Sequence, residues 1–249
     1  MFKGWFGEQK TSLNLWFTLD RKKYQRFSNI IIPSRNGTSQ LDHIVLSPFG
    51  LFIIETKNRK GWIFGSFDQP KWTQVIFERR YSFQNPLRQT YRQKKVLSEF
   101  LNLNESLIQT VVFFNGDSEF MTDLPPNVLS YGLSDYISQF NEEVIDKNEQ
   151  KRISNLLKKL KKENRFSNEE HLQSLDERYS SNTICPKCGS DLVLREVKNG
   201  PNKGSQFLGC DSYPKCRFTK DIEIIDDGYD PIKILVLVGI LIILFYLLY

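Results

Sequence analysis

The sequence predicts an α/β fold for its first 145 residues, followed by smaller attachments. Strand-like and helix-like stretches alternate up to about residue 145, which is typical of α/β domains. The stretch 41–57 is apolar on both of its predicted faces, as expected for strands covered by helices on both sides. A chain of 249 residues with 40% hydrophobic and 25% charged residues has room for one substantial domain. This composition excludes a fibrous or wholly disordered protein.

Four parts are predicted along the chain. Their bounds are 1–145 for the α/β domain, 146–182 for a charged helical linker, 183–220 for a zinc ribbon and 232–249 for a membrane anchor.

The first elements of the domain follow from apolar patterning and turn residues. Residues 7–20 predict a helix, and residues 27–34 predict a strand stopped by Pro33. The next two apolar runs are separated by Ser-Pro-Phe-Gly at 47–50, and Pro at the second position with Gly at the fourth is typical of a type I turn. The two runs therefore predict a hairpin.

The register of this hairpin brings polar residues together. A symmetric turn pairs residues whose numbers add to 97, so Asp42 faces Glu55 and Gln40 faces Lys57. Directly opposed like charges are destabilising, and Lys57 shares the face of Glu55 because strand side chains alternate. A structural ion-pair cluster would explain the lysine but not the second carboxylate, whereas a divalent cation would explain both carboxylates. His43 points to the opposite face, where a core histidine is favoured over a catalytic one.

A second helix and a buried strand complete the domain. Asn85, followed by Pro86, is a typical N-cap, and predicts a helix that carries a basic stripe of Arg88, Arg92 and Lys95. The stripe fits equally a solvated face and a surface that follows a nucleic-acid backbone. Residues 106–116 predict a buried strand that ends at Asn-Gly.

The stretch QLDHIVLSPFGLFIIETKNRKGWIFGS, with the later NPLRQ, resembles the NERD (nuclease-related) domain. Its Asp followed by Glu-x-Lys resembles the core of the PD-(D/E)xK nuclease superfamily, which includes Mrr-type restriction endonucleases. The resemblance implies a restriction-endonuclease-like mixed sheet flanked by helices. It also implies that Asp42 and Glu55 hold Mg²⁺ or Mn²⁺ and that Lys57 orients or activates the attacking water. Glu8 resembles an additional acidic residue of such domains, and Gln89 a polar residue on the helix beside the active site.

All four cysteines lie within 32 residues, in the pattern C-x2-C and C-x5-C: Cys185, Cys188, Cys210 and Cys216. Two such pairs are typical of a closed, tetrahedral and structural zinc site, which is favoured over two disulfides in a cytosolic setting. The segments CPKCG and FLGCDSYPKCRFT resemble the C4 zinc finger of bacterial type I topoisomerases.

The zinc ribbon also carries candidate contacts for nucleic acid. Phe207, Tyr213 and Phe218 could stack on bases beside Lys215 and Arg217. Alternatively, these aromatic side chains form the small core of the ribbon itself.

The last residues predict a single-pass membrane anchor. Residues 234–249 contain no charge, and a helix over 232–249 would span about 27 Å, slightly under the roughly 30 Å of a hydrocarbon core. An oligomerising tail or a buried core helix is the alternative. Because the first residues do not form a signal-peptide pattern, the nuclease-like and zinc domains are expected in the cytoplasm. The linker at 146–182 is interpreted as a solvated amphipathic helix rather than a dedicated binding helix.

These features together predict a membrane-anchored, Mg²⁺-dependent endonuclease acting on nucleic acid, with DNA as the favoured substrate. A net charge of +5 and a pI near 8.9 agree with an anionic partner. The alternative is a noncatalytic DNA-binding protein that tethers nucleic acid at the membrane. Mg²⁺-dependent cleavage separates the two interpretations.

Overall fold

A computed structural model describes residues 19–163 and 168–222. The predicted helix at 7–20 lies almost wholly outside these residues, and the predicted anchor at 232–249 lies entirely outside them. The chain forms two compact units. One consists of Met1–Val193 and Gly209–Phe218, and the other consists of Leu194–Leu208 and Thr219–Tyr249.

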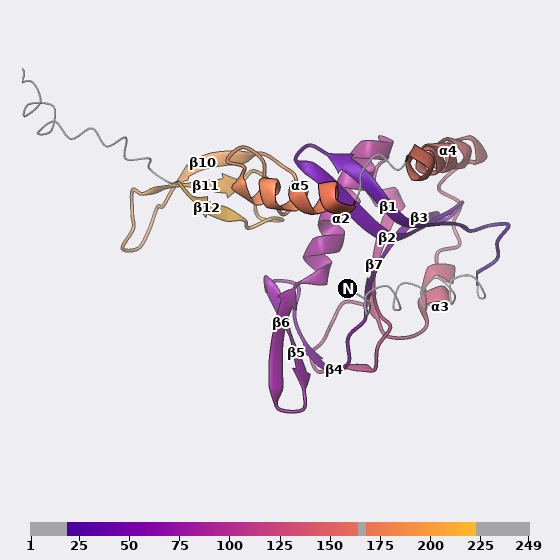
Figure 1. Cartoon of the computed structure of the whole chain (residues 1–249), viewed down its shortest axis with the longest axis horizontal. Coiled ribbons are helices and arrows are strands. Elements are labelled where there is room, and N and C mark those ends of the chain that lie inside the picture. Colours follow the sequence, from indigo (N-terminus) through magenta and orange to yellow (C-terminus); the bar gives the residue numbers. More distant parts are fainter. Residues whose placement is uncertain (1–18, 164–167, 223–249) are drawn as a thin grey trace, which may run out of the picture. The chain divides into compact units, whose positions relative to one another are not determined.

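The first unit is built on a mixed five-stranded sheet in the order β1-β2-β3-β7-β9, of which β1, β2, β3 and β7 are labelled in Figure 1. The first three strands are antiparallel, and β7 pairs parallel with both β3 and β9. A mixed sheet with flanking helices was predicted, and it is confirmed. The strands are β1 Gln25–Ser34, β2 Gly37–Ser47, β3 Gly50–Lys57, β7 Ile108–Phe114 and β9 Val128–Leu129.

The predicted register of the β2–β3 hairpin is confirmed from Ser47–Gly50 to His43–Ile54. These pairs end one residue before Asp42 and Glu55, because the Asp42 carboxylate accepts hydrogen bonds from Thr56 instead. The strand β1 continues to Ser34, one residue beyond Pro33. A proline is tolerated there because β1 is an edge strand, where a missing N–H removes no ladder bond.

Helices cover both faces of the sheet. On one face, α2 (Pro86–Leu101) and α4 (Lys147–Glu163) bury apolar side chains against Ile44 and Ile53, in one continuous core. The predicted N-cap is present, since the Asn85 side chain accepts from the Leu87 N–H at 2.9 Å. On the other face, α3 (Leu133–Ser138) packs against Phe52 and Ile54. The covering of both faces explains the apolar hairpin sequence.

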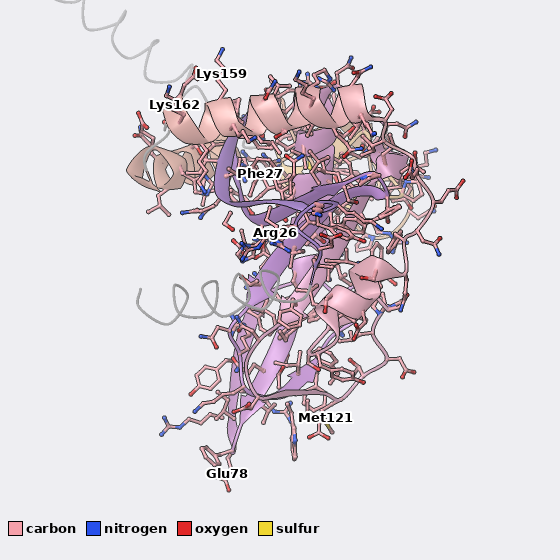
Figure 2. The ribbon with its side chains drawn as sticks, turned by 90° about the vertical axis from the view of Figure 1, so that its right-hand side faces the viewer. Arg26, Phe27, Glu78, Met121, Lys159 and Lys162 are labelled. Carbon is pink, nitrogen blue, oxygen red and sulfur yellow. The ribbon has the colours of Figure 1, made fainter. Side chains whose placement is uncertain are left out.

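The segment predicted as a linker contains two helices that contact the sheet. Ile153 and Leu157 of α4 are fully buried in the core beside β1, and Lys159 lies on the side of α4 that faces away from the sheet (Figure 2). The next helix, α5 (Asn168–Ser180), packs on β2, where the Thr38 N–H donates to Ser174 Oγ at 3.2 Å.

A second, four-stranded sheet was not predicted. Its order is β6-β5-β4-β8, and Trp72 on β5 is fully buried, with its ring stacked 6.3 Å from Phe114 of β7. Glu78 lies at the tip of the β5–β6 hairpin (Figure 2). The strands are β4 Gly61–Phe64, β5 Lys71–Ile76, β6 Arg79–Gln84 and β8 Ser118–Phe120. A 3-10 turn, η1 (Glu105–Leu107), leads into β7.

The second unit contains residues of three short strands that pair in the order β10-β11-β12. The strands are β10 Leu192–Glu196, β11 Gln206–Cys210 and β12 Thr219–Asp221. Among the helices of residues 19–163 and 168–222, none is long and apolar enough to cross a membrane.

Candidate functional site

A buried ion pair stands at the carboxyl end of β3, where the strand runs parallel to β7. Glu55 Oε1 lies 2.5 Å from Lys57 Nζ, and the two side chains are 4% and 18% exposed. They lie on one face because they are two residues apart on a strand, as predicted. Such a pair loses hydration on burial, so it is stable only when further groups complete its hydrogen bonds.

Two glutamines of α2 supply these hydrogen bonds. Gln89 Oε1 accepts from Lys57 Nζ at 2.9 Å, and Gln93 Nε2 donates to Glu55 Oε2 at 2.7 Å. The glutamines are four residues apart, so they occupy one face of the helix. Gln89 was predicted at the site. Gln93 was missed, although its spacing from Gln89 was a usable signal.

The amide of Gln93 leaves one buried oxygen without a donor. Its Nε2 also donates to the Gln40 carbonyl at 3.0 Å, and since both partners are acceptors, the amide orientation is fixed. Gln93 Oε1 is buried and has no hydrogen-bond partner among the described residues. An orphaned acceptor beside a carboxylate fits a site for a hydrated cation or an ordered water.

Asp42 reaches the same region by a local change in the strands. Its Oδ2 accepts from both the N–H and the Oγ1 of Thr56, each at 2.9 Å. On the neighbouring strand β1, the residue opposite Asp42 is Asn29, whose φ of 55° interrupts the extended backbone. Asp42 lines the cavity that Gln93 also lines. The predicted Glu8 lies outside the described residues.

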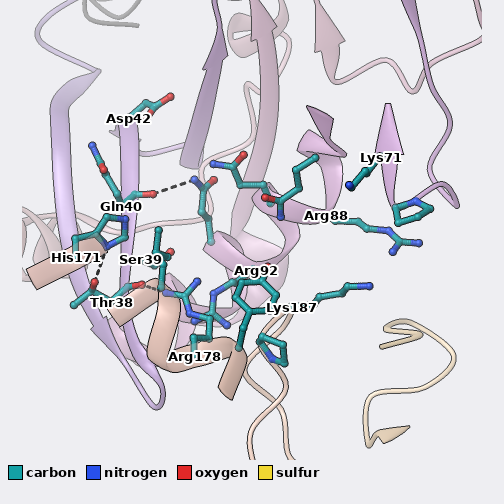
Figure 3. A pocket seen from close by; sticks show the side chains of 17 residues that line it. Thr38, Ser39, Gln40, Asp42, Lys71, Arg88, Arg92, His171, Arg178 and Lys187 are labelled. Carbon is teal, nitrogen blue, oxygen red and sulfur yellow. Dashed lines mark hydrogen bonds between the residues drawn. The ribbon is translucent and has the colours of Figure 1, made fainter. Parts of the chain in front are cut away.

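This first cavity has a volume of about 610 Å³ and walls from β2, α2 and α5 (Figure 3). Its charged lining is strongly unbalanced, with five basic side chains and one carboxylate, that of Asp42. The basic residues are Lys71, Arg88, Arg92, Arg178 and Lys187. A cavity of this charge favours an anionic ligand.

Two residues of α5 join this helix to β2 in the wall of the first cavity. Arg178 is buried and donates to the carbonyls of Thr38 and Asn36, and burial together with the nearby Arg92 lowers the pKa of Arg178 to about 10, so it stays charged at neutral pH. His171 Nδ1 lies 2.6 Å from Thr38 Oγ1, and burial, with a contribution from Arg178, lowers the pKa of His171. No sequence pattern indicated these residues, because their partners lie more than 130 positions away.

The four cysteines converge as predicted. All four are buried, none forms a disulfide, and their Sγ atoms lie within 4.8 Å of one another. The Cys185–Cys216 and Cys188–Cys210 sulfur distances are 3.8 Å and 3.3 Å. A tetrahedral zinc with Zn–S bonds near 2.3 Å requires sulfur separations of about 3.8 Å. Hydrogen bonds from Cys185 and Cys216 lower the pKa of Cys188. The cluster is consistent with structural zinc.

Arg92 connects this cluster to α2. It is 6% exposed, and its Nη2 donates to Asn36 Oδ1 at 2.9 Å, while Asn36 Nδ2 lies 3.5 Å from the Cys185 carbonyl. A Cβ at Gly189, in the loop between the cysteines, would lie 3.6 Å from Arg92 Nη1. Burial lowers the pKa of Arg92, whereas the thiolates of Cys188 and Cys185 raise it. Four thiolates holding one Zn²⁺ would keep two negative charges, which the Arg92 guanidinium would partly offset.

The other predicted residues are distributed over several places. Lys95 pairs with Glu105 at 2.6 Å and does not line the first cavity. Lys215 and Arg217 line a second cavity, together with Tyr91 of α2. His43 is a core histidine, as favoured: its Nδ1 lies 2.9 Å from Ser28 Oγ, and burial lowers its pKa to about 4.

Residues 3–115 match the nuclease-related domain family, and residues 182–224 match the topoisomerase DNA binding C4 zinc finger. An uncharacterized protein of Bacillus anthracis is 38% identical over 113 residues, which are 45% of this chain and 53% of that protein. The uncharacterized protein YrdD of Escherichia coli is 43% identical over 49 residues, which are 20% of this chain and 24% of YrdD.

DNA topoisomerase 1 of Methanothermobacter thermautotrophicus is 43% identical over 44 residues, which are 18% of this chain and 5% of the enzyme. The chain therefore spans about half of the Bacillus anthracis relative and smaller shares of the other two. No solved structure matches the chain. The chain carries a nuclease-related domain at residues 3–115 and a topoisomerase-type C4 zinc finger at residues 182–224.

Proposed function

We propose that the protein is a metal-dependent nuclease that hydrolyses phosphodiester bonds of nucleic acid, with DNA as the favoured substrate. The nuclease-related domain suggests a nuclease-like function, and the C4 zinc finger suggests nucleic-acid binding. One observation carries the proposal: Glu55 and Lys57 are fixed by Gln89 and Gln93, both of which line a cavity rich in positive charge.

The carboxylates of Asp42 and Glu55 are the residues that would hold a magnesium or manganese ion. Magnesium prefers oxygen ligands, usually one or two carboxylates together with waters and substrate phosphate. The orphaned Gln93 Oε1 supports the fit, since it offers a further buried acceptor beside Glu55. When bound, such an ion supplies Lewis acidity toward the phosphate and toward an attacking water.

The side chains of the chain itself would bind and orient the substrate. The Lys57 ammonium is held in one place by Glu55 and Gln89, and its fixed charge would stabilise the negative charge that develops during hydrolysis. Arg88 and Lys71 face the first cavity (Figure 3), where they would pair with phosphates flanking the cleaved bond. The hydrogen bond from Gln93 to Glu55 Oε2 would keep the carboxylate from turning both of its oxygens toward Lys57.

Cleavage of labelled DNA and RNA by the purified full chain tests the proposal. Single-stranded and duplex forms of each would be incubated with Mg²⁺ or Mn²⁺ and with EDTA. We expect products only with a divalent ion. If no substrate is cut and calorimetry detects no binding of either ion, the catalytic proposal is wrong.

A noncatalytic role is the second candidate, and one observation favours it. Both oxygens of Glu55 already accept hydrogen bonds, from Lys57 and from Gln93, as in a purely structural ion pair. In that case the protein would bind nucleic acid, without cleavage, at the membrane. Binding that persists without any divalent ion or product would support this role.

Membrane anchoring is proposed from the sequence of residues 232–249, which lie outside the described residues. Only a helix can satisfy the backbone of such a segment in lipid. We expect the full chain to sediment with membranes and resist carbonate extraction, and a chain shortened to end at Asp230 to stay in the supernatant. Release of the full chain by carbonate would contradict a spanning anchor.

A further inference from the structure

A second cavity, of about 360 Å³, adjoins the first within the same unit of the protein. One side comes from α2 and the loop between β4 and β5, and the other comes from the cysteine loops around Lys187 and Cys216. Arg88 and Lys187 line both cavities, so the two share a wall. The volume lies in the range typical of small-molecule sites.

The surface of this second cavity is apolar and aromatic in part. Phe67, Leu87, Tyr91 and Pro214 contribute its apolar lining, and Phe67 is 59% exposed. The Tyr91 hydroxyl is buried and has no hydrogen-bond partner among the described residues. Burial raises the pKa of Tyr91, so the hydroxyl keeps its proton and can donate. A planar group that also accepts a hydrogen bond would satisfy both features.

Positive charge surrounds this apolar lining. Arg88, Lys187, Lys215 and Arg217 line the cavity, against the single carboxylate of Asp68. Arg88 is held in place because its Nη2 donates to the Asp68 backbone carbonyl at 2.5 Å. An apolar cavity with a cationic lining matches one chemical class well: a nucleotide, whose base has flat faces that stack on apolar side chains and whose phosphate is anionic.

From these features we infer that the second cavity binds an unpaired nucleobase of a nucleic-acid strand. The base stacks on Phe67 and accepts a hydrogen bond at its edge from the Tyr91 hydroxyl, and its phosphates pair with Arg88 and Lys187. A base within a duplex is stacked and paired, so it cannot enter without being extruded. The site therefore selects single-stranded nucleic acid, or a strand with an unpaired base.

The position of Arg88 connects this site to the first cavity. Arg88 is followed in α2 by Gln89, which accepts the hydrogen bond from Lys57. A strand whose phosphate pairs with Arg88 can continue past Gln89 toward Glu55 and Lys57. This continuation rests on the proposed function, whereas the base site does not.

Binding of fluorescein-labelled oligonucleotides to the zinc-loaded full chain tests the inference, by fluorescence anisotropy in EDTA-free buffer without added Mg²⁺ or Mn²⁺. The probes are a single-stranded 12-mer, its duplex, and a single strand of abasic sites. We expect the single strand to bind at least about tenfold more tightly than the other two, since base stacking on an aromatic side chain contributes roughly this factor or more.

The variant Tyr91→Leu removes the ring and the hydroxyl but keeps an apolar side chain. It should weaken single-strand binding about tenfold and leave abasic binding unchanged. The matched control is Tyr131→Leu, at a side chain that is 84% exposed and lines neither cavity. Zinc content and thermal unfolding of each variant show whether it is folded.

Equal binding of the single strand and the duplex, or no effect of Tyr91→Leu in a folded protein, would overturn the inference. Failure of the proposed function would look different. In that case the preference for single strands and its dependence on Tyr91 would persist, but no divalent ion would produce cleavage. Cleavage of a duplex without dependence on Tyr91 would instead support the nuclease and refute the base site.

Discussion

At the scale of single residues, Gln93 shows how a neutral side chain can define a charged site. Its amide nitrogen donates to Glu55 and to the Gln40 carbonyl, and so fixes the Glu55 carboxylate. The amide oxygen of Gln93 then has no donor among the described residues. A hydrophobic residue at this position would leave Glu55 Oε2 without its buried partner. The arrangement therefore holds the Glu55 carboxylate in one orientation, at the cost of one unsatisfied oxygen.

The residues of the site differ in how far the sequence could predict them. Asp42, Glu55 and Lys57 were found because a turn fixes the hairpin register, and the register fixes which side chains share a face. Arg178 could not be found in this way, because α5 and β2 meet only through tertiary packing. The sequence also predicted that Asp42 would pair directly with Glu55, whereas the strand pairing stops one residue earlier. Neither the positive φ of Asn29 nor the hydrogen bonds from Thr56 to Asp42 could be read from the sequence.

Arg92 provides a prediction at this scale. Replacing it by glutamine removes the charge near the thiolates but keeps an amide that can reach Asn36. We expect zinc transfer to a chelator to become about tenfold faster, in the range found for outer partners of metal ligands. The measurement is the absorbance of a chromogenic chelator over time. Arg79→Gln, at an exposed residue of β6, is the matched control, and equal release rates for the two variants would contradict the role of Arg92.

At the scale of elements, α2 organises both proposed sites. One row of the helix carries Gln89 and Gln93, which hold the ion pair, and the neighbouring row carries Arg88 and Arg92. Arg92 approaches the cysteine cluster, and Arg88 lies in the wall between the two cavities. A single helix therefore supports Glu55 and Lys57 with one row of side chains and approaches the cysteine cluster with the next.

The sequence predicted the hairpin, α2 and β7, because a turn, an N-cap and a long apolar run each specify local structure. It did not predict β4, β5 and β6. These strands are four to six residues long, and β6 exposes all but one of its residues, so no apolar alternation marks it. Their position is set instead by the burial of Trp72 against Phe114, a contact between distant parts of the chain.

His43 of β2, buried beside Ser28 of β1, gives a specific prediction of how the stability of the fold depends on pH. Burial lowers the pKa of His43 from 6.5 to about 4 in the folded chain, so the unfolded chain binds more protons between pH 6.5 and pH 4. The folded state therefore loses stability as the pH falls through this window, by up to about 3 kcal/mol from this group alone.

Urea unfolding at pH 7 and pH 4.5 measures this effect. Carboxylates contribute over the same range, so the comparison with His43→Gln isolates the histidine. We expect the variant to lose less free energy of unfolding than the wild type between the two pH values. Equal losses would show that His43 does not remain neutral in the fold.

At the scale of the whole molecule, the first unit joins segments from both ends of the described chain around one region of positive charge. The β2 strand, α2, α5 and the first cysteine loop all contribute to the first cavity. Five basic side chains and one carboxylate line this cavity, so it carries an excess of positive charge. The cysteine cluster is placed to stabilise this wall, since Asn36 contacts Cys185, Arg92 and Arg178.

The central claim is that Glu55 takes part in metal-dependent cleavage, and one measurement tests it most directly. It is the rate of Mg²⁺-dependent cleavage of a labelled strand by Glu55→Gln, compared with Glu78→Gln at the exposed tip of the β5–β6 hairpin (Figure 2). We predict that Glu78→Gln cleaves at the wild-type rate, and that Glu55→Gln is at least about a hundredfold slower while its far-ultraviolet circular dichroism is unchanged. Equal cleavage by the two folded variants would contradict the claim.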